Sequence, residues 1–213
     1  MMKLLPALLW VLLAGLTGGC TESPPASNGK LEQPLIAAAE AGDIERLANL
    51  LSQQADVDGR DSCQWTPLMK AALNGHRAVT ERLLSAGAGI DLTDNGGYSA
   101  LMLAASNNHF QLVDRLLEQG ANPNIQEMTR GWSALIWAAK RGHRESVERL
   151  LKGGAAPDIR DFDGHSAADW AQRNKHLSIV RLLTKSPFRP GLAARPARQQ
   201  GVTAEEIRDE DKQ

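Results

Sequence analysis

The chain has 213 residues, of which 42 % are hydrophobic, and its formal net charge at pH 7 is −1. This length has room for one ordinary domain with tails. The near-neutral charge argues against a nucleic-acid partner, which requires a basic face or stripe. Two cysteines, Cys20 and Cys63, are too few for a fold held together by disulfides.

Residues 1–20 have the features of a secretory signal peptide. Lys3 supplies a positive charge, an apolar run of 13 residues extends from Leu4 to Leu16, and small residues precede Cys20. The run is too short to span a bilayer comfortably. The segment L-T-G-G-C, ending at Cys20, resembles a bacterial lipobox in which Thr17 replaces the usual leucine. This resemblance implies that the Cys20 thiol receives diacylglycerol. The alternatives are a plain signal cleaved nearby and an uncleaved anchor.

Residues 21–32 are polar and contain Pro, Ser and Gly, so they are predicted to form a flexible tether. Thr21 follows the lipidated cysteine, whereas inner-membrane retention is typically associated with Asp at that position. We therefore expect a periplasmic lipoprotein held at the outer membrane through Cys20. A soluble periplasmic or secreted protein is the alternative.

An internal repeat occupies residues 33–185. The segment from Trp65 to His76 reads W-T-P-L-M-K-A-A-L-N-G-H, and the segment from Trp132 to His143 reads W-S-A-L-I-W-A-A-K-R-G-H. Self-similarity at a fixed period is the mark of a solenoid. A Thr or Ser recurs at intervals of 33, 34 and 33 residues, at Thr66, Ser99, Ser133 and Ser166.

Each unit carries the signals of two helices. The Thr or Ser can cap the first helix, with Pro67 at its first turn in one unit. Gly75 and Gly142 suit the left-handed residue that ends this helix, and Asn108 and Lys175 take the same place in other units. The second helix carries paired leucines such as Leu116–Leu117 at helical spacing, and Leu117 is predicted to be a core residue. The fold class is therefore all-α, a solenoid of about five helix–loop–helix units joined by short turns.

These units resemble ankyrin repeats. The family pattern D-x-x-G-x-T-P-L-H-x-A-A-x-x-G-H is matched closely from Asp61 to His76 and from Asp94 to His109. The resemblance implies stacked helix pairs with hairpins projecting from one edge. The family histidine after T-P-L is replaced, so its polar contacts between repeats are not expected, and Met69, Met102 and Ile136 can replace them only with apolar packing. The hairpin that begins at Glu127 has one extra residue. The replacing residues are Met69, Met102, Ile136 and Asp169.

Several clusters that suggest chemistry have simpler explanations. Stacked units place one histidine each about 10 Å apart, too far for a shared ion, at His76, His109, His143 and His176. The acidic run Asp158–Gly164 lacks the remaining ligands of an EF-hand loop, because Ile159 and Trp170 stand there. No catalytic motif is present, so we expect no enzyme activity, cofactor or metal. Cys63 is a lone exported thiol if Cys20 is lipidated, and a Cys20–Cys63 disulfide is the alternative.

The remaining candidate for function is a surface. The residue before each capping Thr or Ser lies, in the ankyrin family, at the base of a hairpin on the concave side. Here these residues are Trp65, Tyr98, Trp132 and His165. Aromatic residues in register predict a row of partner-binding anchors, surrounded by the polar residues Asn74, Asn107 and Arg141.

The alternative for the aromatic row is that its residues pack on neighbouring hairpins. Trp132 is expected to lie outside the core, and Trp137 and Trp170 inside it. If the aromatic row is packing, the binding site would move to the hairpin tips, at Asn95, Arg130 and Phe162. Four basic residues predict a mildly basic concave side: Lys70, Lys140, Arg141 and Arg173.

The sequence thus favours a non-enzymatic protein-binding module in the bacterial envelope. Two roles fit equally: support of a periplasmic enzyme, or immunity against a toxic effector. The alternative is a structural envelope lipoprotein that serves as a spacer. Residues 186–213, rich in Arg, Pro, Ala, Gln and acids, are predicted to be a disordered tail.

Overall fold

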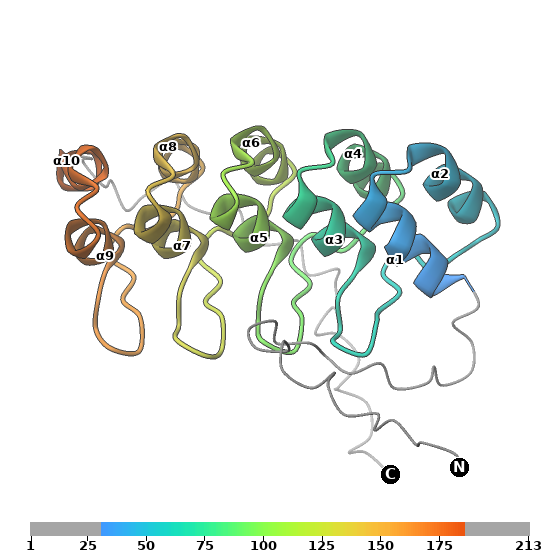
Figure 1. Cartoon of the computed structure of the whole chain (residues 1–213), viewed down its shortest axis with the longest axis horizontal. Coiled ribbons are helices and arrows are strands. Elements are labelled where there is room, and N and C mark those ends of the chain that lie inside the picture. Colours follow the sequence, from blue (N-terminus) through green and yellow to red (C-terminus); the bar gives the residue numbers. More distant parts are fainter. Residues whose placement is uncertain (1–30, 186–213) are drawn as a thin grey trace, which may run out of the picture.

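The computed structural model describes residues 31–185 and shows a row of helix pairs with hairpin loops on one side (Figure 1). The predicted signal peptide, Cys20, most of the tether and the tail lie outside these residues. Within residues 31–185 there are ten helices, in five pairs. They are α1 Glu32–Ala41, α2 Ile44–Ser52, α3 Pro67–Asn74, α4 Arg77–Ser85, α5 Ala100–Ser106, α6 Phe110–Glu118, α7 Ala134–Arg141, α8 Arg144–Lys152, α9 Ala167–Arg173 and α10 Leu177–Lys185.

The predicted helix caps are confirmed. The hydroxyl of Thr66 accepts a hydrogen bond from the backbone N–H of Met69, which satisfies one of the free donors at the start of α3. Ser99, Ser133 and Ser166 cap α5, α7 and α9 in the same way. In the last unit the carboxylate of Asp169 also accepts a hydrogen bond from the backbone N–H of Ser166, so the two residues cap each other.

The residues predicted to end the first helices adopt the left-handed conformation. Gly75 and Gly142 have φ of 77° and 82°, and Asn108 and Lys175 have φ of 58° and 62°. Gly142 has a second reason to lack a side chain, because a Cβ there would lie 2.7 Å from the ring of His176. Backbone conformation and the close approach of the next unit therefore select glycine together.

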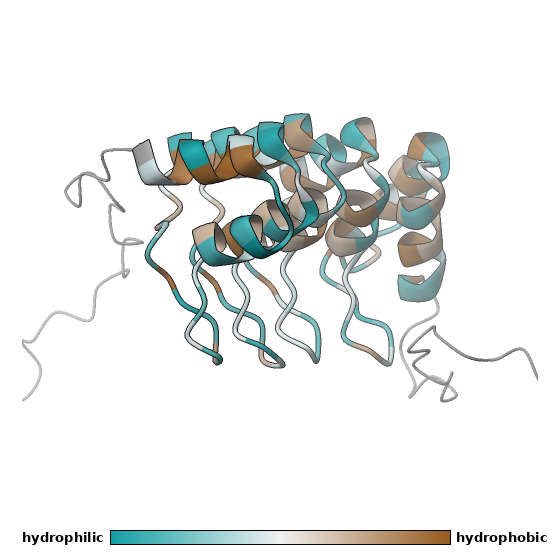
Figure 2. Ribbon diagram, turned by 60° about the vertical axis from the view of Figure 1, so that its left-hand side comes forward, coloured by the Kyte–Doolittle hydropathy of each residue, from teal (hydrophilic) through white to brown (hydrophobic). Residues whose placement is uncertain are grey.

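The helices form two layers. The odd-numbered helices pack side by side next to the hairpins, and the even-numbered helices form the outer layer (Figure 1). The alanines Ala104 and Ala105 are fully buried where α5 meets its neighbours. Hydrophobic residues gather on the helices, whereas the hairpins are mostly hydrophilic (Figure 2). In the described part of the chain no helix is long and apolar enough to cross a membrane.

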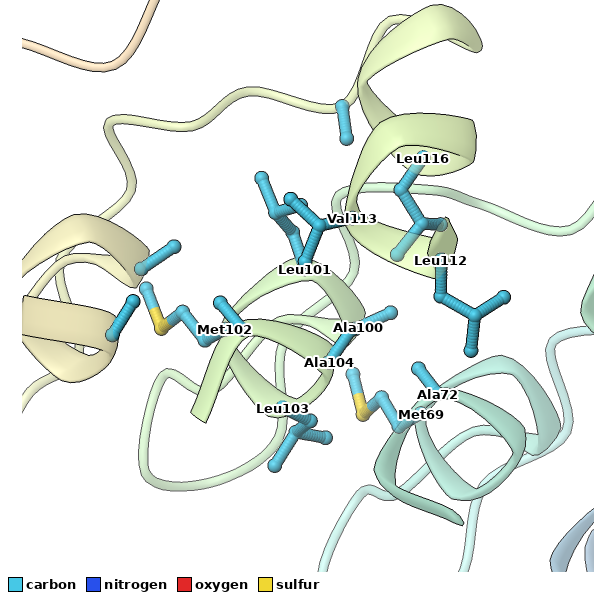
Figure 3. Close-up of a cluster of buried hydrophobic side chains, with 14 of the residues drawn as sticks. Met69, Ala72, Ala100, Leu101, Met102, Leu103, Ala104, Leu112, Val113 and Leu116 are labelled. Carbon is cyan, nitrogen blue, oxygen red and sulfur yellow. The ribbon is translucent and has the colours of Figure 1, made fainter. Parts of the chain in front are cut away.

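Apolar packing replaces the family histidine, as the sequence predicted. Met69 reaches from α3 towards Ala104 of α5, and Met102 reaches from α5 towards α7 (Figure 3). Both side chains, and Ile136 in the next unit, are 1 % exposed. Contacts between these units are therefore formed by dispersion and burial of apolar surface.

The paired leucines are not equivalent, which corrects the expectation for Leu117. Leu116 is fully buried beside Leu112 and Val113 (Figure 3), whereas Leu117 is only partly buried against the core. Successive residues of a helix point about 100° apart, so one leucine faces the inner layer and the other lies at its margin. Leu117 instead lies over the turn of the following unit, near Gly153.

The hairpins form no extended sheet within the described residues, where only isolated bridges occur. Neighbouring hairpins are joined tip to tip: the N–H of Met128 bonds the carbonyl of Gly96 at 2.8 Å, and the N–H of Phe162 bonds that of Arg130 at 2.9 Å. An acidic residue closes each hairpin. Asp94 accepts from the backbone N–H groups of Gly96 and Tyr98.

Glu127 closes the hairpin that is one residue longer. Its carboxylate accepts from the N–H groups of Thr129, Arg130 and Trp132, and from the Thr129 hydroxyl. Burial alone would raise the pKa of Glu127. The hydrogen bonds from these donors stabilise the ionised carboxylate more strongly, so the pKa lies below its ordinary value. The longer side chain matches the longer loop.

The four histidines at equivalent positions link successive units. The Nε2 atom of His76 lies 2.9 Å from the carbonyl oxygen of Glu40, and that of His109 lies 3.0 Å from the carbonyl oxygen of Leu73. His143 and His176 make the same contact one and two units further on. These geometries support the structural role expected for the histidines.

Candidate protein-binding surface

An aromatic ladder runs across the odd-numbered helices and hairpin bases of the last three units. We use this name for five residues, which follow one another in the order Tyr98, Trp137, Trp132, Trp170 and His165. Successive ring centroids are 6.1, 4.7, 5.3 and 5.6 Å apart. The two contacts of Trp132 are edge-to-face, at 84° and 74°, which is a favoured geometry for aromatic pairs.

The repeat creates this order by interleaving two sequence positions. Tyr98, Trp132 and His165 come directly before a helix cap, whereas Trp137 and Trp170 lie one turn inside α7 and α9. Stacking the units places each helical tryptophan between two hairpin residues. Both helical tryptophans pack against the core, as expected, but remain partly exposed and belong to the ladder.

Trp132 is a core residue, which corrects the expectation that it stands outside the core. Its side chain is only 5 % exposed. Its indole N–H donates to Asp161 Oδ2 at 3.0 Å, and the indole N–H of Trp170 donates to the same oxygen at 2.7 Å. One carboxylate of the next hairpin thus fixes both rings.

Asp161 is buried, and both oxygens of its carboxylate accept hydrogen bonds. Its Oδ1 accepts from the backbone N–H groups of Asp163 and His165 at 3.1 and 2.7 Å. Burial raises the pKa of Asp161, but the bond from the His165 N–H, the two indoles and Asp163 together hold it below the ordinary value.

Asp161, Asp163 and His165 bring possible metal ligands within 4.8 Å of one another. The carboxylate of Asp161 is already satisfied by four donors, two on each oxygen. A cation would have to displace these hydrogen bonds. The donor set therefore fits a structural role and not a metal site.

Basic side chains cover the ladder. Lys140 Nζ lies 4.8 Å from the ring centroid of Trp132 and 5.4 Å from that of Trp170. The guanidinium of Arg141 lies 5.2 Å from the Trp137 centroid, and that of Arg173 lies 5.1 Å from the Trp170 centroid. These are cation–π distances. The predicted basic character of this side is therefore concentrated in the last two units.

The first aromatic residue stands apart from the ladder. Trp65 is partly buried, Lys70 lies 4.8 Å above its ring, and Lys70 also pairs with Glu40 at 3.5 Å. The side chains predicted as polar contacts are exposed at the ends of α3, α5 and α7, namely Asn74, Asn107 and Arg141.

The hairpin tips carry two exposed apolar side chains. Met128 is 69 % exposed and Phe162 is 67 % exposed, on neighbouring hairpins. Phe162 lies over Gly131, where a Cβ would be 2.7 Å from its ring. Arg130 connects these tips to the ladder, because its guanidinium lies 5.2 Å from the Trp132 ring. The tips at Arg130 and Phe162, predicted as the alternative site, therefore adjoin the ladder.

Sequence reasoning missed the place of Trp137 and Trp170 in the ladder. The available signal was their shared repeat position, occupied by Lys70 and Leu103 in earlier units. A side chain at that position contacts the residue before the cap of an adjacent unit only if the two units are displaced relative to each other by a suitable distance. That quantity is set by tertiary packing.

The fold and this surface define a helical repeat solenoid that presents side chains along its hairpin edge. The sequence profile of ankyrin repeats matches residues 35–127 and 126–192, and the chain belongs to the ankyrin-repeat family. Ankyrin repeats generally mediate protein–protein interaction.

A similar protein is the mitochondrial disaggregase of Bos taurus. It is 35 % identical over 71 residues, which is 33 % of this chain and 10 % of the relative. The chain therefore spans only a small part of that relative, and the similarity concerns the repeats.

Proposed function

We propose that this protein is a non-enzymatic binding module that holds a partner protein against the aromatic ladder. The observation that carries the proposal is the set of partly exposed rings, Tyr98, Trp137 and Trp170, each next to the buried Trp132 or to another ring of the ladder. Tryptophan, tyrosine and arginine dominate the energetics of protein interfaces. Rings held in place by their neighbours lose little freedom when a partner binds.

The chemistry of the ladder supports binding. The rings of the ladder and the cations over them can contact apolar and anionic groups of a partner, while the carboxylate of Asp161 beside them is occupied by hydrogen bonds. A spacer without a specific partner would not require aligned rings with basic side chains above them. The ladder therefore favours a specific interaction over the spacer alternative.

Photo-cross-linking tests the location of the binding surface. A photo-reactive residue in place of Tyr98 or Arg173 should capture a partner, and the same residue in place of Arg46 on α2 should not, because α2 belongs to the outer layer. Trp170→Ala should weaken the captured interaction by about 2 kcal/mol. Equal capture from position 46 would show that the ladder is not the site.

We also propose that the protein works in the bacterial envelope, as an outer-membrane lipoprotein anchored through Cys20. Support comes from the charged start, the apolar run and the lipobox-like L-T-G-G-C of residues 1–20. Two acyl chains or more are needed for stable anchoring. The partner would then be a periplasmic enzyme that the module supports, or a toxic effector that it blocks.

Intact-mass measurement of the mature protein tests this address. A lipidated chain begins at Cys20 and carries the added acyl mass. The alternative, a Cys20–Cys63 disulfide, uses the same Cys20 thiol and appears as a mass increase of two hydrogens per disulfide after reduction. Lipid on Cys20 and that disulfide exclude each other, so a mature chain without acyl mass would refute the lipoprotein proposal.

A further inference from the structure

Charge changes along the inner helices from one end of the solenoid to the other. At one repeat position the successive units carry Glu40, Leu73, Ser106, Lys140 and Arg173. At the following repeat position Arg141 is the basic residue, and the other four units carry Ala or Asn there. The whole chain is nearly neutral, so the basic end is a local feature of the ladder and not a property of the composition.

Within residues 31–185, the basic side chains that lie over the ladder form no ion pair with a carboxylate. Six lysine and arginine side chains of residues 31–185 form ion pairs, for example Arg77 with Glu81 at 3.0 Å and Arg144 with Glu148 at 2.8 Å. Over residues 31–185, Lys140, Arg141 and Arg173 make no ion pair. The acids nearby are already occupied: Asp161 by hydrogen bonds, and Asp169 by Ser166 and by Arg160 at 3.7 Å.

These cations are also held in position. Arg141 donates from Nη1 to the carbonyl oxygen of Ser106 at 3.1 Å while its guanidinium lies over Trp137. Arg173 Nη1 lies 2.9 Å from Nε2 of His165 while it lies over Trp170. The donor in this pair is Arg173, so Nε2 of His165 is the acceptor. Cations that are ordered before binding lose less entropy when they meet an anion.

We propose that the partner segment bound by the ladder is an acidic stretch of polypeptide with aromatic or aliphatic side chains between its carboxylates. The carboxylates pair with Lys140, Arg141 and Arg173, and the apolar side chains pack on the exposed parts of Tyr98, Trp137 and Trp170. This inference rests on the proposed function and adds the chemistry of the partner. The guanidinium groups suit carboxylates because they present several donors in one plane.

The test uses the full chain and two short synthetic peptides, one alternating Glu with Tyr and one with Gln in place of every Glu. We expect the Glu–Tyr peptide to bind at least about tenfold more tightly, and its binding to weaken as salt is raised. The double variant Lys140→Gln, Arg173→Gln should lose this preference while its thermal unfolding stays cooperative. The matched control is Arg46→Gln, an exposed outer-layer cation outside every ion pair of the described chain.

A variant with reversed charges distinguishes lost recognition from unfolding, because an unfolded variant would not gain a new peptide preference. The double variant Lys140→Glu, Arg173→Glu should reject the Glu–Tyr peptide and bind a Lys–Tyr peptide instead. Equal affinity of the wild-type chain for the Glu–Tyr and Gln–Tyr peptides would overturn the inference. So would an oligonucleotide that displaces the Glu–Tyr peptide and binds more tightly, since the surface would then read any polyanion.

The outcomes separate this inference from the proposed function. If Trp170→Ala weakens partner capture but the Lys140 and Arg173 variants do not change it, the ladder binds a partner that is not acidic. If neither change affects capture, the ladder is not the binding surface.

Discussion

Trp132→Ala is expected to lower the free energy of unfolding by about 4 kcal/mol. A buried tryptophan side chain removes on the order of 150–250 Å² from water. At about 25 cal/mol per Å², burying this area stabilises the fold by about 4–6 kcal/mol. Alanine retains the Cβ, which accounts for roughly 1 kcal/mol of this and is not lost. Trp132 is 5 % exposed, so nearly all of this area applies, and the result agrees with the usual range of about 3–5 kcal/mol for Trp→Ala in cores.

Two further variants divide the effect into its parts. Trp132→Phe keeps most of the ring but removes the donor to Asp161, which retains the bond from Trp170, so we expect a loss of about 1–2 kcal/mol. Trp137→Ala removes a partly exposed ring whose indole N–H has no acceptor in the described chain, so we expect a smaller loss than for Trp132→Ala.

Urea denaturation followed by far-UV circular dichroism measures these three losses. Each unit contacts mainly its neighbours, so broadening of the transition would show that the last two units separate from the rest. The reasoning would be refuted if Trp132→Ala cost less than about 1 kcal/mol, or no more than Trp137→Ala. Trp132 would then be an exposed anchor after all.

Three other changes test separate parts of the structure by the same denaturation assay. The pKa of Asp161 is depressed in the folded state, so its carboxylate stabilises the fold above the unfolded pKa of about 3.9, and this contribution disappears as the pH falls through the folded pKa. Asp161→Asn should therefore cost about 1–3 kcal/mol at neutral pH, and the difference from wild type should shrink at acidic pH. Leu116→Ala should cost about 2–5 kcal/mol and Leu117→Ala clearly less, because only Leu116 is fully buried; equal losses would contradict the assigned burial. Glu127→Asp should cost about 1–3 kcal/mol, because the shorter side chain cannot reach all the backbone donors of the longer hairpin; an unchanged stability would show that these bonds contribute little.

Most of the fold could be predicted from the sequence because its signals are local. Thr66 caps α3 through an atom three residues away, and Gly75 and Asn108 adopt the left-handed conformation that ends a helix in its own turn. The period of 33 or 34 residues then repeats these signals. A solenoid built from neighbour contacts follows from such a repeat without any long-range information.

The candidate site could be predicted only in part. The sequence indicated that Tyr98 and Trp132 belong to one row and that Arg141 lies beside it. It could not show which ring is buried. That depends on Asp161, which is 29 positions from Trp132 and reaches it only after the next unit has stacked.

By itself, the sequence determined the helix pairs, their caps, their ends and the apolar contacts of Met69 and Met102 between units, since each depends on residue type and on spacing within one period. Tertiary structure alone decided that Trp132 is buried, that Trp137 and Trp170 alternate with the hairpin residues, and that Lys140 and Arg173 have no carboxylate partner within residues 31–185. The physical reason is the shift between adjacent units. It fixes which side chains of different units meet, and no signal within a single unit specifies it.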